Sequence, residues 1–179
     1  MSMRESFKQI LESFPSFYLC CLRMKRRNHW SRKWVVSKQS DLCVEGFPRS
    51  ANSFALHALL DAQPDPDRIS VATHTHSPAQ VRHAVACRVP TMVCVRNPRA
   101  AVRGLLAFDA ELQSRATGQW ASPDRQKCQQ AIIRWQWFHS QILSVVDQVF
   151  VAEFQDIISD FERVSERFIN HFGLSLNPF

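Results

Sequence analysis

From Asp41 onward, short apolar runs alternate with stretches in which apolar residues recur at helical spacing. This alternation is typical of a parallel β-sheet covered by helices, because each parallel strand needs a crossover connection before the next one. We therefore predict an α/β fold, with a short parallel sheet of about four strands and helices on both faces.

The expected strands are apolar runs bounded by polar or turn residues. They cover Leu42–Val44, Ile69–Thr73, Thr91–Val95 and Val149–Val151. Helices are expected over Ser53–Leu60, from Pro78, over Arg99–Phe108, over Cys128–Val145 and over Ile157–Phe172, with Gly173 as a left-handed cap. A polar loop is expected over Ser114–Pro123.

The first forty residues differ from the rest of the chain in charge. They hold nine Lys and Arg against two acids, a net charge of +7, so the remainder of a chain of net charge +6 carries −1. We therefore divide the chain into a basic, partly helical N-terminal arm at 1–40 and an α/β domain at 41–179. An amphipathic helix is expected near Met3–Phe14, followed by basic clusters at Arg23–Arg27 and Arg32–Lys33.

Two interpretations of the basic arm stay open. One is a solvated linker that packs an aromatic side chain such as Trp30 or Trp34 onto the domain. The other is a contact with a polyanion or an anionic membrane surface, because clustered Lys and Arg raise the local potential. Nothing in the arm indicates a specific nucleic acid.

The apolar run Phe14–Leu22 is shorter than the roughly 20 residues of a membrane span, and its charges follow it instead of preceding it. We expect neither a transmembrane helix nor a cleaved signal. The six cysteines show no CxxC spacing, and Cys43 and Cys94 lie inside apolar runs. Reduced thiols and a cytoplasmic location are therefore expected.

The segment between the first strand and its helix is the most informative motif. It runs Gly46-Phe47-Pro48-Arg49-Ser50-Ala51-Asn52-Ser53, at a turn where backbone N–H groups and a helix N-terminus can bind an anion. The spacing of a Walker loop is kept, but Ala51 replaces its second glycine and Asn52 its lysine, which argues against a typical ATPase or GTPase. Arg49 supplies a cation instead. The alternative is a plain strand-to-helix turn rich in capping residues.

Two further segments place polar groups at strand ends. Arg96 follows the strand Thr91–Val95, and its planar guanidinium suits a phosphate, although a surface salt bridge is the alternative. His74 and His76 follow the second strand and share one face by strand alternation, so both imidazoles are expected in the same cleft. Imidazole can act as a base near neutral pH. A zinc site at this pair lacks a third ligand, His83 being a weak candidate.

In this order the segments resemble those of sulfotransferases that use 3′-phosphoadenosine 5′-phosphosulfate. Pro48–Phe54 is similar to the family's 5′-phosphosulfate loop, Val93–Arg99 to its 3′-phosphate segment, and His76-Ser77-Pro78 to the segment that carries its general base. The resemblance covers about Asp41 to Leu174. It implies a sulfotransferase fold of the P-loop NTPase type.

The resemblance implies an enzyme that transfers a sulfuryl group from this donor to a hydroxyl or amine of a small-molecule or carbohydrate acceptor, without a metal. Arg49 would stabilise the leaving 5′-phosphate oxygen, and His76 would accept the acceptor's proton. The implied donor-binding residues are Arg49, Ser50, Ala51, Asn52, Ser53, Phe54, Arg96 and Gly104. The loop N–H groups and the side chains of Asn52 and Ser53 would hold the 5′-phosphosulfate. Phe54 would pack on the adenine, and Arg96 would bind the 3′-phosphate.

Three positions depart from the family pattern. Ala51 replaces a glycine that often needs positive φ, at a cost on the order of 1 kcal/mol. Gly104 stands where a serine usually contacts the 3′-phosphate, and Phe154 replaces a tyrosine. These departures leave open a catalytically weak or inactive binding protein on the same fold. A divergent P-loop kinase is the other alternative, and it would need magnesium and ATP.

Overall fold

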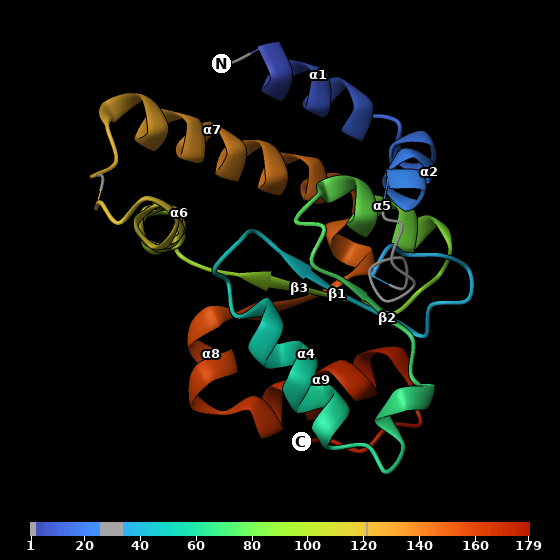
Figure 1. Ribbon diagram of the computed structural model, residues 1–179. Helices are drawn as coiled ribbons and strands as arrows, with labels where there is room; N and C mark the ends of the chain where they lie inside the picture. The colour runs from blue at the N-terminus through green and yellow to red at the C-terminus, as the bar shows by residue number, and fades with distance from the viewer. Residues whose placement is uncertain (1–2, 26–33, 121) are drawn as a thin grey trace.

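The computed structural model describes residues 3–25, 34–120 and 122–179. Its centre is a parallel sheet in the order β2-β1-β3-β4. The strands are β1 Leu42–Gly46, β2 Val71–Thr73, β3 Thr91–Val95 and β4 Phe150–Glu153. Helices lie above and below this sheet (Figure 1), so the expected α/β fold is confirmed.

The helices form two layers. The lower layer in Figure 1 holds α4 Asn52–Asp61, α8 Phe154–Ser159 and α9 Phe161–Phe172. The upper layer holds α1 Met3–Glu12, α2 Pro15–Lys25, α5 Pro78–Ala86, α6 Pro98–Thr117 and α7 Arg125–Ile142. Short 3-10 helices cover Pro66–Arg68 and Leu143–Gln148.

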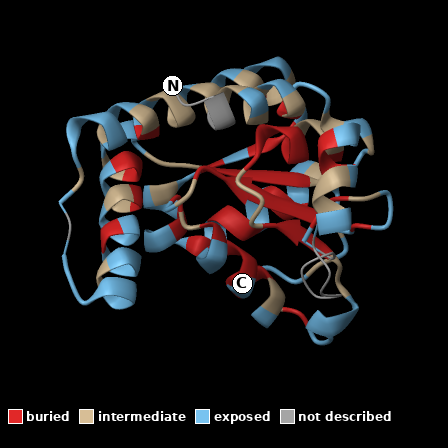
Figure 2. Cartoon of the chain, turned by 45° about the horizontal axis from the view of Figure 1, so that its top comes forward, coloured by how far each residue is buried: buried red, intermediate tan, exposed pale blue. Residues whose placement is uncertain are grey.

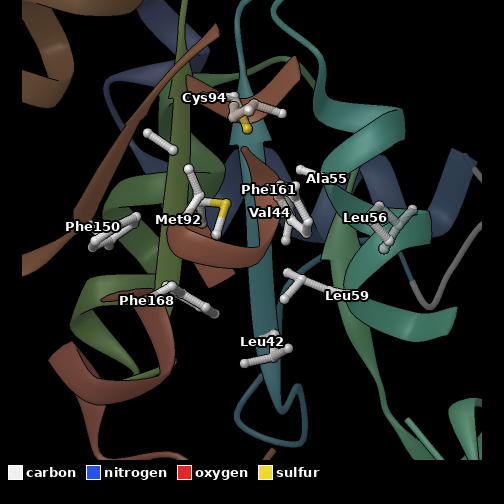
Figure 3. Packing of buried hydrophobic residues seen from close by; sticks show 14 of the residues in the cluster. Leu42, Val44, Ala55, Leu56, Leu59, Met92, Cys94, Phe150, Phe161 and Phe168 are labelled. Carbon is white, nitrogen blue, oxygen red and sulfur yellow. The ribbon is translucent and has the colours of Figure 1, made fainter. Parts of the chain in front are cut away.

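The sheet is buried between the two layers, as Figure 2 shows by its red strands. Leu42, Val44, Met92 and Cys94 point toward α4 and α9, where they pack with Phe168 (Figure 3). Alternate residues of the same strands pack against the other layer. Because both faces are covered, the strands are nearly continuous apolar runs, which is why the sequence predicted a parallel sheet.

The thiols of Cys43 and Cys94 are fully buried in this sheet. Burial raises the pKa of both thiols, and the neighbouring Glu45 carboxylate adds to the shift. Both cysteines therefore serve as small hydrophobic residues, as the sequence predicted. All six cysteines are free thiols.

Helix α6 is longer than predicted. It was expected to end near Phe108 but continues to Thr117, so the predicted loop at Ser114–Pro123 is wrong over its first four residues. Most residues in these last turns are polar. The sequence therefore shows no apolar stripe that would have predicted a helix there. The helix ends at Gly118, whose φ of 71° gives it a left-handed cap.

The predicted closing helix is two helices. Helices α8 and α9 are separated at Asp160, whose carboxylate accepts the backbone N–H of Arg163 and caps α9. The sequence signal missed this break because apolar residues keep helical spacing across it. Gly173 ends α9 with a φ of 63°, which confirms the predicted left-handed cap.

The N-terminal arm packs onto the α/β domain. Helix α2, which was not predicted, buries Tyr18 and Leu19 in a cluster with β1 and α5. Arg23 donates to the carbonyl oxygens of Val35 and Val36, which are also buried. Among the described residues, no helix combines the length and apolar character that a membrane span needs. Trp30 and the basic residues at 26–33 lie outside the described residues.

Candidate functional site

The sheet order fixes where a ligand can bind. Strand β1 has β2 on one side and β3 on the other, so the connections that leave the first and third strands run to opposite sides. Such a switch point opens a crevice at the carboxyl ends of the strands. A cavity of about 740 Å³ lies there, within the usual size range of ligand pockets. Its lining includes the predicted site residues Arg49, Ala51, Asn52, Ser53, His76 and Arg96.

The loop after β1 has an unusual backbone. Arg49 and Ala51 each have a φ of 69°, in the left-handed region that favours glycine. Ala51 thus has the positive φ that the glycine of the pattern often needs. A left-handed conformation costs a non-glycine residue about 1–2 kcal/mol, so the loop keeps its shape only because its surroundings hold it.

The start of α4 offers unsatisfied hydrogen-bond donors. Ala51 occupies the N-cap position, and no side chain of the described residues caps the helix. The first backbone N–H groups of a helix have no partner within the helix. Ser50, the residue before this N-cap, is fully buried and does not line the cavity, and its Oγ has no hydrogen-bond partner in the described part of the chain. The loop and helix start are thus suited to an anion.

Two arginines line the cavity side by side. Arg96 donates from Nη1 to the carbonyl oxygen of Arg49 at 2.9 Å, so it supports the loop as well as the cavity. Its guanidinium carbon lies 3.8 Å from the centre of the Phe154 ring, a cation–π contact. Its Nε is buried and has no partner among residues 3–25, 34–120 and 122–179. The guanidinium of Arg49 lies 5.1 Å from the centre of the Phe108 ring.

Gly104 lies next to both arginines. A Cβ at this position would lie 3.4 Å from Cβ of Arg49 and 3.5 Å from Nη1 of Arg96. These are ordinary van der Waals distances to flexible side chains. A small side chain at position 104 would therefore lie next to both guanidinium groups.

His76 is anchored at the edge of the cavity. Its Nδ1 lies 2.9 Å from the carbonyl oxygen of Gly46. Because a carbonyl only accepts, we assign the proton to Nδ1, which leaves the lone pair of the ring on Nε2. The ring of His74 lies 5.8 Å away, and its Nε2 is 2.9 Å from Oγ of Ser53.

Both histidines line the same cavity, which confirms the predicted shared cleft. The physical reason differs from the one predicted. Strand β2 ends at Thr73, and His74 and His76 have φ values of 53° and 49°. Left-handed residues in the turn, and not strand alternation, bring the two rings together.

The turn that carries His76 is held by a buried acid. Glu45 is fully buried in β1, and its Oε1 accepts the backbone N–H of Thr75 at 2.9 Å. Sequence reasoning missed this residue. A lone carboxylate inside an otherwise apolar strand was the available signal, because a buried charge requires a partner.

Three predicted donor-binding side chains have other contacts. Asn52 donates from Nδ2 to the carbonyl oxygens of Gly46 and Phe47, at 3.2 and 3.3 Å, and so braces the loop. The hydroxyl of Ser53 pairs with His74. Phe54 lies outside the cavity lining, with its ring 5.6 Å from that of Phe161. Nothing in this arrangement supports the prediction that Phe54 packs on an adenine. Among the described residues, the phenylalanine rings that line the cavity are those of Phe108 and Phe154.

Two other histidines lie apart from this cavity. His83 lies on α5, 3.4 Å from Oγ of Ser16, so it does not join the pair at 74 and 76. Burial lowers its pKa, and the charge of Arg23 adds to the shift. Burial also lowers the pKa of His139, partly offset by its hydrogen bond to the Trp135 carbonyl. Within the described ranges, no three His, Cys, Asp or Glu side chains gather closely enough for a metal.

The cavity therefore combines two guanidinium groups, an uncapped helix start and an oriented imidazole. This combination can bind an anion with more than one negative group and can accept a proton beside it. Comparisons of the chain with protein-family models, with curated proteins and with solved structures each gave no match, so this geometry carries the functional argument.

Proposed function

We propose that the protein is a sulfotransferase that moves a sulfuryl group from 3′-phosphoadenosine 5′-phosphosulfate to a hydroxyl or amine of a small-molecule or carbohydrate acceptor. One observation carries the proposal. Arg49, Arg96 and His76 line a single cavity at the switch point of the sheet, next to an uncapped helix start. The donor has negative charge at two separate places, its 5′-phosphosulfate and its 3′-phosphate, and the cavity supplies two cationic side chains.

The cavity offers N–H groups that can bind the negatively charged groups of this nucleotide. The backbone N–H groups of the loop and of the start of α4, where Asn52 and Ser53 line the cavity, would bind the 5′-phosphosulfate. A phosphate against the Arg96 guanidinium would accept from N–H groups other than the one that binds the Arg49 carbonyl oxygen. The ring of Phe154, in contact with this guanidinium, would hold it in place.

His76 would act as the general base. Its Nε2 accepts the proton of the acceptor hydroxyl or amine, while the acceptor oxygen or nitrogen attacks the sulfur. The bond between sulfur and the bridging oxygen breaks, and 3′,5′-bisphosphoadenosine leaves. Arg49 stabilises the negative charge that develops on the leaving oxygen. Glu45 is a positioning residue, because it holds the turn that carries His76.

A binding protein without turnover is the second candidate. The side chains of Asn52 and Ser53 are engaged within the protein, which leaves fewer groups for the donor. The cysteines are free thiols, two of them buried, which is consistent with a reducing compartment, and we propose a cytoplasmic location.

The proposal predicts that the purified chain binds 3′,5′-bisphosphoadenosine and that Arg49→Ala weakens this binding at least about tenfold, because one charge-assisted contact is lost. Calorimetric titration measures the affinity. Arg103→Ala removes an exposed arginine from the same region and should leave the affinity unchanged. Equal binding of ATP with magnesium, or no nucleotide binding, would contradict the proposal. Binding without sulfuryl transfer to any of a panel of acceptors would favour the second candidate.

Gly104→Ser is expected to tighten bisphosphate binding by roughly ten- to a hundredfold, because a hydroxyl beside both guanidinium groups adds a hydrogen bond to a charged ligand. Gly104→Ala is the matched control. It should raise the free energy of unfolding by up to about 1 kcal/mol through helix propensity, with little change in affinity. Equal affinities of the serine and alanine variants would place the 3′-phosphate away from position 104.

A further inference from the structure

Helices α1 and α2 expose large apolar side chains on their outer side. Phe7, Ile10, Phe14, Phe17 and Met24 are between 59% and 67% exposed. We call these five residues the apolar face. They lie on two consecutive helices and their connection, at the outer edge of the upper layer in Figure 1. Exposed apolar side chains gathered in this way mark a surface that binds something.

The inward side of α1 carries a buried acid as well as Leu11, which packs against the core. Glu12 is only 4% exposed, accepts the indole N–H of Trp137 at 3.1 Å and pairs with Lys8 at 3.4 Å. A helix on the surface of a soluble domain normally packs its apolar stripe against the core. Burial against the domain therefore does not account for Phe7 and Ile10.

Helix α2 repeats the arrangement in part. Tyr18 and Leu19 are buried against the domain, whereas Phe17, Cys20 and Met24 recur at i, i+3 and i+7 and are exposed. The spacing places these three residues on one outward side of the helix. Both helices thus leave large apolar side chains exposed.

The net charge of the arm that carries the apolar face selects its partner. The first forty residues carry a net charge of +7, and one of their two acids, Glu12, is buried. Lys25 and Lys38 are exposed. Aromatic and aliphatic side chains with surrounding basic charge are typical of helices that lie in the interface of an anionic membrane. A second copy of the chain would bring two strongly positive arms together, and a nucleic acid would leave Ile10 and Met24 without an apolar partner.

We propose that the apolar face docks onto the surface of a bilayer that contains anionic lipids, with α1 and α2 lying in the interface. The apolar side chains enter the boundary between headgroups and acyl chains, and the basic residues contact the headgroups. This inference does not depend on the proposed donor site.

Co-sedimentation of the full chain with vesicles tests the proposal. Vesicles of phosphatidylcholine with phosphatidylserine are expected to bind the chain at least about tenfold more tightly than vesicles of phosphatidylcholine alone. Phe7→Gln with Phe17→Gln should weaken binding to the anionic vesicles about tenfold or more, because two aromatic rings no longer leave water. Leu112→Gln with Ile132→Gln is the matched control, since these side chains are 48% and 47% exposed on α6 and α7.

The outcomes separate the alternatives. Unchanged binding by the Phe7→Gln, Phe17→Gln chain, or equal loss in the control, would overturn the proposal. Absence of vesicle binding would also overturn the proposal. If the unchanged chain then forms a dimer that the Phe7→Gln, Phe17→Gln chain does not form, the apolar face binds a second copy instead. Tighter binding to RNA than to anionic vesicles would also overturn it. Circular dichroism checks that each variant keeps its helical content.

Discussion

Arg96→Ala is expected to weaken the binding of 3′,5′-bisphosphoadenosine by roughly a hundredfold. Two charge-assisted hydrogen bonds to a phosphate, at about 1.5 kcal/mol each, amount to about 3 kcal/mol. The change also removes the donor to the Arg49 carbonyl, so the loop loses support on the same side. Calorimetric titration at fixed salt concentration measures the loss.

Two control variants distinguish the contributions of charge and shape. Arg96→Lys keeps a positive charge but lacks the planar pair of donors, so an intermediate loss of about tenfold is expected. Phe154→Leu removes the ring next to the guanidinium and keeps the charge, and it should cost less than Arg96→Ala. If Arg96→Ala remains folded and binds the bisphosphate as tightly as the unchanged chain, Arg96 does not contact the ligand.

Gly46→Ala is expected to lower the free energy of unfolding by about 3 kcal/mol or more. A Cβ at this position would overlap the carbonyl oxygen of Cys94 on β3 and would lie 2.5 Å from Oδ1 of Asn52. The first of these is backbone in the centre of the sheet, so relief requires β1 and β3 to move apart. Strand pairing at the switch point therefore depends on glycine here.

Urea unfolding followed by circular dichroism measures this loss. Gly104→Ala is again the matched control, because its new methyl group has room and its position is helical. The two changes add the same methyl group at glycines of β1 and α6, and they are expected to shift stability in opposite directions. A Gly46→Ala protein as stable as the unchanged chain would show that the strands tolerate the separation.

The fold was largely predictable because its signals are local. Each buried parallel strand is an apolar run, and a helix such as α7 keeps its apolar spacing over many residues. The errors arose where local signals are weak. Helix α6 continues through polar residues, and α8 and α9 are separated at Asp160 within an unbroken apolar pattern.

The candidate site was predictable only in part. Arg96 follows β3 directly, and Arg49 and His76 come three residues after the ends of β1 and β2. Parallel strands bring their carboxyl ends to one edge of the sheet. The partners in contacts between distant segments could not be predicted, even where a residue such as Glu45 was itself conspicuous as an acid in an apolar strand. The ring of Phe108 reaches the cavity from a later turn of α6, and Glu45 acts through a turn thirty residues away.

The left-handed residues bear on how a ligand would enter the cavity. Five non-glycine residues with positive φ occur in the described ranges, and four of them, Arg49, Ala51, His74 and His76, line this cavity. Such conformations persist where neighbouring groups over-determine them, so the loops are already in their final shape before a ligand arrives. A rigid receptor requires no slow rearrangement on binding. Association should then be fast and steered by the two arginines, and differences in affinity among ligands should arise mainly from their dissociation rates.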